Sequence, residues 1–263
     1  NVATLRAAPN VVVSETGGEN VGFIAYNTQQ PPFDNPEVRK ALNMAVNMDA
    51  IIEAVYAGQA VRARNPLPAS SWASNPDTPY VAYDPEAAKA ALAAAGVTDL
   101  SMKLWWMPVA RPYNPNGKLM GELLQADWQA IGVNVELVSQ EWGAYLEATS
   151  SVERDGAVMI GWGADNADPD NFLGVLLSCV GVGTNNRAQW CYEPYDALIQ
   201  KGKATFDEDE RKAIYYEAEA IFQDQQPWLL LAHSNQFLAH NKRVVNFKHD
   251  PLGFHRFEGV DIQ

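Results

Sequence analysis

Short apolar runs alternate along the chain with amphipathic segments. The runs are rich in Val, Ile, Leu and aromatic residues and are bounded by Gly, Pro, Asn or Asp, which predicts β-strands. The predicted strands cover residues 10–15, 21–27, 100–107, 133–139, 157–162 and 227–233. Apolar residues at helical spacing predict helices over residues 34–47, 48–58, 84–96, 117–132, 141–150, 168–178, 194–205 and 207–225. Strands that alternate with helices indicate an α/β fold with a largely parallel, helix-covered sheet.

The stretch 59–83 has no clear periodicity and is rich in Pro, Ser and Asn. We expect it to be an ordered loop anchored by Trp72 and Tyr80. Loops of this length are usually functional or wrapped around another part of the protein. The loop therefore leaves open a third kind of function, an interaction domain that binds no small ligand.

Composition excludes some partners. The chain has 263 residues, of which 47% are hydrophobic, and a formal net charge of −13 with a pI near 4.7. An acidic protein is repelled by nucleic-acid backbones and anionic membrane surfaces, so we expect no nucleic-acid partner.

No run approaches the ~18 apolar residues that a membrane-spanning helix needs, which predicts a soluble protein. The chain begins without Met or a signal-peptide pattern, and we expect a mature form or a fragment from which any export signal is gone.

Two cysteines, Cys179 and Cys191, lie close together in the sequence. Such a pair suits a disulfide in an oxidising compartment, and two buried free thiols are the alternative. A structural zinc site needs four ligands, and the four histidines lie far downstream, so no zinc site is expected.

The loops that follow strands are the places to search for a site, because ligands of open α/β sheets bind beyond the carboxyl ends of strands. The loop MPVARPYNPN after the strand at 100–107 carries Arg111 beside Tyr113, and GWGADNADPDN after the strand at 157–162 carries Trp162 and Asp165. Opposite charges at neighbouring strand ends could bind a zwitterion. The alternatives for Asp165 are a surface charge or an ion pair with Arg111.

Three aspartates share the second loop, and their spacing separates their roles. Asp168 precedes Pro169 and is predicted to cap the following helix, with Asp170 in its first turn, where negative charge suits the helix dipole. Asp165 lies too early to cap that helix, so its carboxylate is available for another purpose.

A calcium loop is a rival interpretation of the same stretch, because Asn166, Asp168 and Asp170 have the 1-3-5 spacing of calcium ligands. Asn171 stands where such loops need Gly, and Leu177 stands where they need a bidentate Glu. We therefore expect no metal site.

Enzyme motifs of the serine hydrolase, zinc protease, P-loop and dinucleotide-binding types are missing from the sequence. A hydrolase of the glycosidase type could use two of the aspartates, with Trp162 as a platform for a sugar. That alternative predicts turnover that Asp168→Asn abolishes. The main expectation is a protein that is not an enzyme, with no catalytic residue and no cofactor.

The chain resembles the solute-binding proteins of peptide-importing ABC transporters, most of all the members that bind dipeptides. The resemblance rests on NVGFIAYNTQQPPFDNPEVRKALNMAVNMDAI, WWMPVARPYNPN, GWGADNADPDNF, SC followed by WCYEPYDALI, and DPLGFHRFEGV, in that order. It implies a bilobal periplasmic protein of the type II, peptide-binding class, which closes on its ligand and delivers it to a membrane permease. It also implies that Asp165 holds the α-ammonium group of a dipeptide or short peptide and that Arg111 holds the α-carboxylate.

The same resemblance implies further site residues. Tyr113, Trp142, Trp162 and Gly163 are expected to shape the ligand pocket, and Cys179 and Cys191 match the family's disulfide.

Family members are roughly twice as long as this chain, and the missing part is the N-terminal lobe. The resemblance thus divides the chain into a strand segment of the absent lobe at 1–21, a mixed-sheet α/β lobe at 22–234 that grips the ligand, and a tail at 235–263 that returns to the other lobe. We expect the two hinge crossings near 16–27 and 233–240. Relatives with this fold carry other cargo, so haem, a metal chelate, a sugar or an opine remain alternatives to a peptide.

Overall fold

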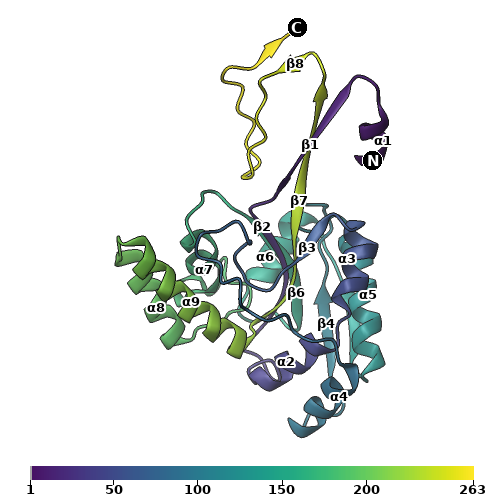
Figure 1. Ribbon diagram of the computed structural model, residues 1–263. Helices are drawn as coiled ribbons and strands as arrows, with labels where there is room; N and C mark the ends of the chain where they lie inside the picture. The colour runs from purple at the N-terminus through teal and green to yellow at the C-terminus, as the bar shows by residue number, and fades with distance from the viewer. Residues whose placement is uncertain (1) are drawn as a thin grey trace.

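The computed structural model describes residues 2–263, and its centre is one mixed sheet of seven strands (Figure 1). The strands lie in the order β1-β7-β2-β6-β4-β5, and β3 pairs with β7. They are β1 (Val11–Gly17), β2 (Asn20–Tyr26), β3 (Ala60–Arg62), β4 (Ser101–Trp105), β5 (Asn134–Val138), β6 (Ala157–Gly163) and β7 (Trp228–Asn241). A separate pair near the C-terminus joins β8 (Val244–Val245) to β9 (Asp261–Ile262).

Helices connect most of these strands. They are α1 (Val2–Ala7), α2 (Pro36–Met44), α3 (Met48–Tyr56), α4 (Pro85–Ala94), α5 (Gly117–Ala130), α6 (Trp142–Ser150), α7 (Asp170–Leu177), the 3-10 turn η1 (Cys179–Gly181), α8 (Glu193–Ala204) and α9 (Glu208–Gln225). Every strand and helix predicted from the sequence is present, with ends that shift by a few residues, except that β7 continues to Asn241. The predicted ranges do not include α1, β3, the 3-10 turn η1 or the short pair β8 and β9.

The sheet is mixed, so the prediction of a largely parallel sheet is wrong, whereas the mixed-sheet lobe implied by the resemblance is confirmed. β4 runs parallel to β5 and β6, but β2 runs antiparallel to β6 and β7, and β7 also runs antiparallel to β1 and β3. Strand direction depends on how the chain returns to the sheet through long connections, and apolar periodicity carries no information about that path. The continuous apolar runs report burial on both faces, and β2 is buried along its whole length.

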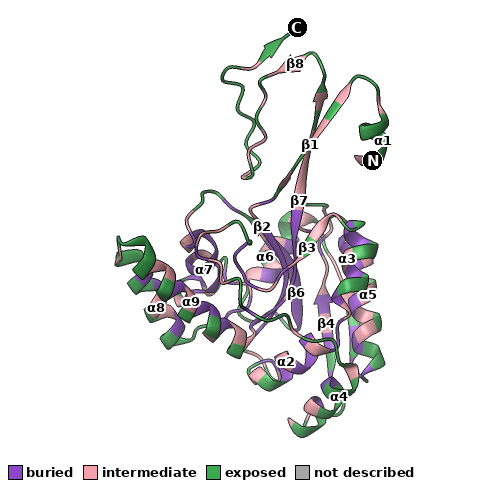
Figure 2. Ribbon diagram, in the orientation of Figure 1, coloured by how far each residue is buried: buried purple, intermediate pink, exposed green. Residues whose placement is uncertain are grey.

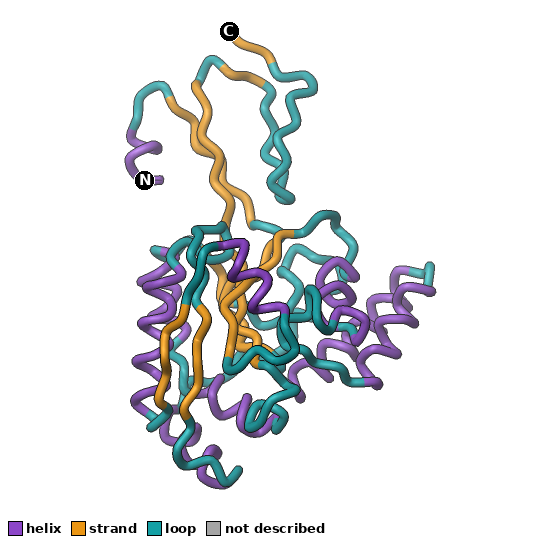
Figure 3. Tube along the Cα trace, turned by 180° about the vertical axis from the view of Figure 1, so that it is seen from behind, coloured by secondary structure: helices purple, strands orange, loops and turns teal. Residues whose placement is uncertain are grey.

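Helices lie on both sides of the sheet. α3 and α5 lie on one side, and α7, α8 and α9 gather on the opposite side (Figures 1 and 3). The buried residues concentrate in β2, β6 and the first half of β7 (Figure 2). There Phe23 stacks on Trp228 with ring centroids 3.7 Å apart, and Phe222 of α9 meets the same indole edge-on at 5.6 Å. These aromatic contacts join two strands and a helix into one core.

β1 and the second half of β7 leave this lobe as a two-stranded ribbon (Figure 1). Their antiparallel pairing runs from Gly17 opposite Asn235 to Val11 opposite Asn241. The ribbon is half-buried or exposed, in contrast to the strands inside the lobe (Figure 2). The tail folds back beside the ribbon, where the carbonyl oxygen of Pro251 accepts a hydrogen bond from the backbone N–H of Glu19.

A buried hydrogen-bond cluster lies at the base of the ribbon. Asn20 Nδ2 donates to the carbonyl oxygen of Ser234 at 3.0 Å, and Asn20 Oδ1 accepts from the backbone N–H of Ser234 at 3.0 Å. His233 Nδ1 lies 2.7 Å from the carbonyl oxygen of Asn20. Gly18 is required beside this cluster, because a Cβ there would lie 2.5 Å from the Ser234 carbonyl oxygen. Burial lowers the pKa of His233 to about 4, against the opposing effect of its backbone hydrogen bonds.

Candidate functional site

A hollow of about 390 Å³ opens beyond the end of β6. Its size falls within the range of small-ligand sites. Five of the six side chains or glycines predicted to contact ligand lie in its wall: Tyr113, Trp142, Trp162, Gly163 and Asp165. The sixth, Arg111, is not part of the wall, but its guanidinium lies over the ring of Trp142, 5.2 Å from the centroid.

Asn171 holds two of these residues in place. Asn171 Oδ1 accepts hydrogen bonds from Trp162 Nε1 at 3.0 Å and from the backbone N–H of Asp165 at 2.9 Å, and its Nδ2 donates to Asp165 Oδ2 at 3.3 Å. Asn171 is nearly buried in the first turn of α7, whereas Asp165 is exposed. The carboxylate of Asp165 is therefore both oriented and accessible.

Tyr113 is packed against the strands by two glycines. A Cβ at Gly161 would lie 2.2 Å from Tyr113 Cδ2, and a Cβ at Gly22 would lie 2.4 Å from the Tyr113 carbonyl oxygen. That carbonyl oxygen also accepts a hydrogen bond from the Tyr56 hydroxyl at 2.9 Å. Burial raises the pKa of the Tyr113 phenol, although the nearby Arg111 acts to lower it. The phenol is therefore neutral near pH 7 and can donate or accept a hydrogen bond.

Arg111 is exposed at the tip of its loop. The backbone of Arg111 pairs with that of Asn114 in both directions, which closes a tight turn. Neither Arg111 nor Asp165 forms an ion pair with any residue that the structure describes. The alternative in which these two residues neutralise each other is thus wrong, and both charges are open to other partners.

The sequence did not reveal the remaining wall residues, which are mostly apolar: Phe23, Leu146, Ile160, Gly161, Leu176, Asn185 and Arg187. Most of them belong to strands and helices whose apolar residues are those expected of a hydrophobic core. Arg187 lies in the loop between η1 and α8, far in sequence from both predicted loops. Arg187 is the single charged residue of this otherwise uncharged, largely polar loop, and that was the signal that could have drawn attention to it.

The two other aspartates of the loop are engaged elsewhere. The N-cap of α7 is Pro169, with no side-chain cap hydrogen bond, so the prediction that Asp168 caps this helix is wrong, whereas Asp170 lies in the first turn as predicted. Asp168 accepts a hydrogen bond from the backbone N–H of Asp170 at 2.9 Å. Asp168 also pairs with Arg211 at 2.9 Å, and Asp170 lies 3.2 Å from Lys203. Burial alone would raise the pKa of Asp168, but the hydrogen bonds from Arg211 and the Asp170 amide bring it below its usual value. Such paired carboxylates are poor candidates for acid–base catalysis.

The described residues contain no cluster of three or more His, Cys, Asp or Glu side chains that could hold a metal ion. Cys179 and Cys191 form a disulfide with their Cα atoms 4.5 Å apart, so the prediction of a disulfide is confirmed. It closes the loop that carries Arg187.

The stretch 59–83 is bound to its own lobe. It contains β3, which pairs with β7, and the backbone N–H of Asn75 donates to Glu219 of α9 at 2.9 Å. Trp72 packs against Tyr215 and Arg211, as expected of an anchor, whereas the exposed Tyr80 is contacted by Arg64 at 4.6 Å from its ring centroid. These contacts favour a structural role for the loop over a role in binding a partner.

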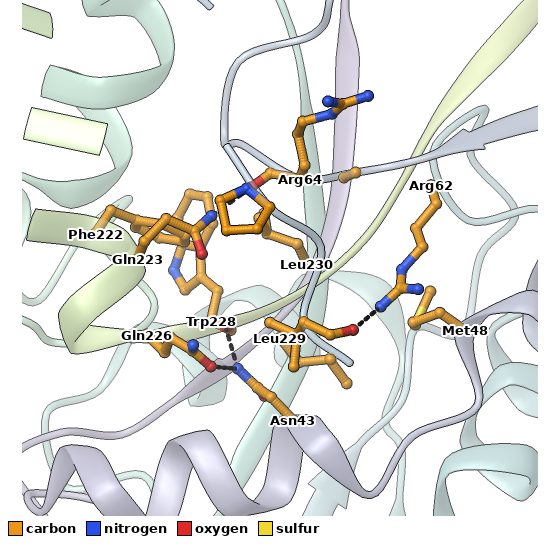
Figure 4. Close-up of a pocket in the computed structure, with 13 residues that line it drawn as sticks. Asn43, Met48, Arg62, Arg64, Phe222, Gln223, Gln226, Trp228, Leu229 and Leu230 are labelled. Carbon is orange, nitrogen blue, oxygen red and sulfur yellow. Dashed lines mark hydrogen bonds between the residues drawn. The ribbon is translucent and has the colours of Figure 1, made fainter. Parts of the chain in front are cut away.

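A second hollow lies between β7, the end of α9 and the loop after β3 (Figure 4). Asn43 lines this hollow, and its Nδ2 donates to Gln226 Oε1 at 2.8 Å and to the Trp228 carbonyl oxygen at 3.0 Å. The volume of this hollow is about 20 Å³. That is enough for about one water molecule and too little for a solute.

In the described part of the chain, no helix is both long enough and apolar enough to cross a membrane. Residues 1–184 match the middle region of family 5 of the bacterial extracellular solute-binding proteins.

Individual proteins match over the whole chain. The dipeptide-binding protein of Escherichia coli K12 is 44% identical over 265 residues, which cover 100% of this chain and 49% of that protein. Heme-binding protein A of Haemophilus influenzae is 40% identical, with coverages of 100% and 48%. A crystal structure of a dipeptide-binding protein from Pseudoalteromonas sp. SM9913 in complex with Met-Leu superposes with a TM-score of 0.90 at 37% identity, over 100% of this chain and 52% of the other. The chain thus spans about half the length of these relatives.

Proposed function

Because the chain belongs to family 5 of the bacterial extracellular solute-binding proteins, whose activity is binding and not catalysis, we propose that it forms the ligand-gripping half of a periplasmic dipeptide-binding protein. The complete protein captures a dipeptide or short peptide and delivers it to the membrane permease of an ABC importer.

The observation that carries this proposal is a pair of opposite charges beside one hollow, neither of which forms an ion pair with the described residues. Asp165 lies in the wall and binds the α-ammonium group, and Arg111 lies across Trp142 and binds the α-carboxylate. An extended dipeptide spans about 7 Å at 3.3–3.6 Å per residue, so two fixed charges select for ligand length as well as charge. Hydrogen bonds to charged groups are stronger than neutral ones, and they gain further when closure removes water from the site.

The division of the chain follows from the same proposal. Residues 22–234 form the gripping lobe, and the segments 1–21 and 235–263 belong to the second lobe, which the N-terminal half of the protein supplies. The exposed ribbon of β1 and β7 supports this division, because its half-buried side chains lack a covering layer within the lobe (Figure 2). Closure then requires bending near the base of this ribbon.

Two other functions receive less support. A haem-binding relative is 40% identical to this chain, yet a hollow flanked by charges of both signs suits a zwitterion better than it suits a flat macrocycle. A carboxylate-dependent hydrolase would need Asp168 or Asp170 free, and both are paired with cations.

Isothermal titration of the full-length protein, as its gene encodes it, tests the proposal. The panel contains Ala-Ala, Met-Leu, a tripeptide, free leucine and haem. We expect tight binding of the dipeptides, and losses of about 100-fold or more in Asp165→Asn and Arg111→Ala, since each change leaves a ligand charge unpaired in the closed site.

Matched controls remove a charge of the same sign elsewhere on the surface. Asp99→Asn and Lys118→Ala alter exposed residues outside the wall of the hollow and should leave affinity unchanged. Full dipeptide affinity in both site variants would show that the dipeptide does not bind in this hollow. Tight binding of haem alone would show that haem, and not a peptide, is the ligand.

A further inference from the structure

We propose that Arg187 makes the site prefer peptides that carry an acidic side chain in addition to their charged termini. This inference rests on the peptide-binding function proposed above and names the class of peptide.

The backbone around Arg187 is held rigidly. The disulfide between Cys179 and Cys191 closes its loop, and Asn186 Nδ2 donates to the carbonyl oxygens of Ser178 at 3.1 Å and Trp190 at 2.7 Å. The carbonyl oxygen of Arg187 itself accepts a hydrogen bond from the buried Arg154 at 2.7 Å. The side chain is therefore presented to the hollow from a fixed position.

Among the residues that the structure describes, acceptors are found for one nitrogen of the Arg187 guanidinium. Arg187 Nη1 donates to the carbonyl oxygen of Leu146 at 2.7 Å and to Thr149 Oγ1 at 3.2 Å, both on α6. Nε and Nη2 have no acceptor among the described residues, although a guanidinium offers five N–H donors. Arg187 is half-buried, and burial lowers its pKa without removing the charge at any physiological pH. These two nitrogens are not among the buried polar atoms that lack a partner, so they are accessible and free to donate to a ligand.

The charged residues around the hollow indicate what kind of acceptor Arg187 would bind. Asp165 and Arg187 are the charged residues of the wall, and Arg111 lies just beyond Trp142. None of the three forms an ion pair within the described part of the chain. A zwitterionic peptide neutralises Asp165 and one arginine, which leaves one cation over.

An acidic side chain on the ligand would neutralise the remaining cation. The wall of the hollow that Arg187 lines is largely apolar and includes Leu146, Ile160 and Leu176. In such surroundings a charge-assisted hydrogen bond is stronger than in water, and an unpaired charge is more costly. A peptide with one Asp or Glu side chain would thus pair with all three charged residues, Asp165, Arg111 and Arg187.

A purely structural role for Arg187 is the alternative, since its Nη1 ties the loop to α6. Loss of that tie would weaken the binding of every peptide by the same factor. The ratio of two dissociation constants, for an acidic peptide and its amide isostere, separates the two roles because a uniform loss cancels in it.

The test is isothermal titration of the full-length protein with Ala-Glu against Ala-Gln and Glu-Ala against Gln-Ala. We expect the Glu member of at least one pair to bind about tenfold more tightly, as a hydrogen bond between two charged groups exceeds a neutral one. Arg187→Gln should bring that ratio to about one, whereas Arg187→Lys and the surface control Lys118→Ala should keep a preference for Glu.

Each outcome decides between the proposals. If both pairs bind with equal affinity, or if Arg187→Gln keeps the native ratio, the inference is wrong while the dipeptide function stands. If no dipeptide binds, both fall together. If the Arg187 variants do not fold, which thermal melting would reveal, equal affinities within both pairs in the native protein still overturn the inference.

Discussion

The ring of Tyr113 packs on the backbone of Gly161 so closely that a Cβ at position 161 would lie 2.2 Å from Tyr113 Cδ2 and 2.5 Å from the carbonyl oxygen of Val21. The contact joins the loop after β4 to the middle of β6, at the wall of the hollow. The close approach of the Gly161 backbone holds the ring of Tyr113 in place. Gly161 permits this contact because it has no Cβ, and it therefore carries no side chain that would suggest a role in the site.

Gly161→Ala should therefore displace Tyr113 and strain the pairing of β6 with β2. We expect a loss of stability of about 1–3 kcal/mol, as for other overpacked interiors, together with weaker dipeptide binding. Urea unfolding and calorimetric titration measure the two effects. Gly17→Ala is the matched control, because a Cβ there has no atom within 4 Å. Native affinity in Gly161→Ala would show that Tyr113 does not shape the site.

Asn171→Ala should loosen Trp162 and Asp165 together. The change leaves the indole N–H and the Asp165 amide without their acceptor, which should cost about 1–3 kcal/mol of stability. Because Asp165 also loses the hydrogen bond from Asn171 Nδ2, dipeptide affinity should fall about tenfold, the equivalent of ~1.4 kcal/mol. Asn134→Ala, which alters an exposed amide on β5, should change neither quantity. Stability loss without any loss of affinity would argue against Asp165 as a ligand contact.

His233 should make the protein less stable as the pH falls from about 6.5 to about 4. Burial lowers the pKa of the folded state to about 4, so the unfolded chain binds a proton in this range and the folded protein does not. The full effect is about 2–4 kcal/mol, present above pH 6.5 and lost as the pH falls through 4. Urea unfolding of His233→Gln at several pH values should show a shallower dependence than the native protein. His255→Gln, at an exposed histidine, should keep the native slope.

Glu219 should contribute a pH dependence of the opposite sign. Its Oε1 atom is buried without a partner among the described residues, and burial raises its pKa to about 8 against the opposing hydrogen bond from the Asn75 amide. The folded state therefore keeps a proton that the unfolded chain releases above about pH 4.5, so this stability is complete below pH 4.5 and is lost as the pH rises through 8. Glu219→Gln should gain stability relative to the native protein between pH 5 and 8, measured by urea unfolding. Glu217→Gln, exposed on the same helix, should not; an equal gain there would assign the effect to net charge.

The sequence predicted the elements and the place of the candidate site for the same physical reason. Strand and helix patterns reflect local burial, and they survive in any tertiary arrangement that buries the same residues. Once the strands ending near Trp105 and Gly163 were identified, the loops that follow them were the places for a ligand, and five predicted residues do line one hollow. Their roles toward a ligand remain predictions.

The interactions between distant segments could not be predicted in this way. Strand direction, the length of β7 and the pairing of β3 depend on how the chain crosses the lobe, which leaves no periodic trace. The sequence also left open whether Asp165 pairs with Arg111, and it gave Asn171 no role beyond arguing against calcium.

The local structures, the acidic character and the chemistry available in two loops can be derived from the amino-acid sequence without the fold. Three features follow only from the folded arrangement: Asp165 and Arg111 form no ion pair with the residues that the structure describes, Asn171 orients the carboxylate, and Arg187 lines the hollow from a third loop. Burial leaves a pattern of apolar residues along the chain, whereas the balance of charge in a hollow depends on residues that are brought together only when the chain folds.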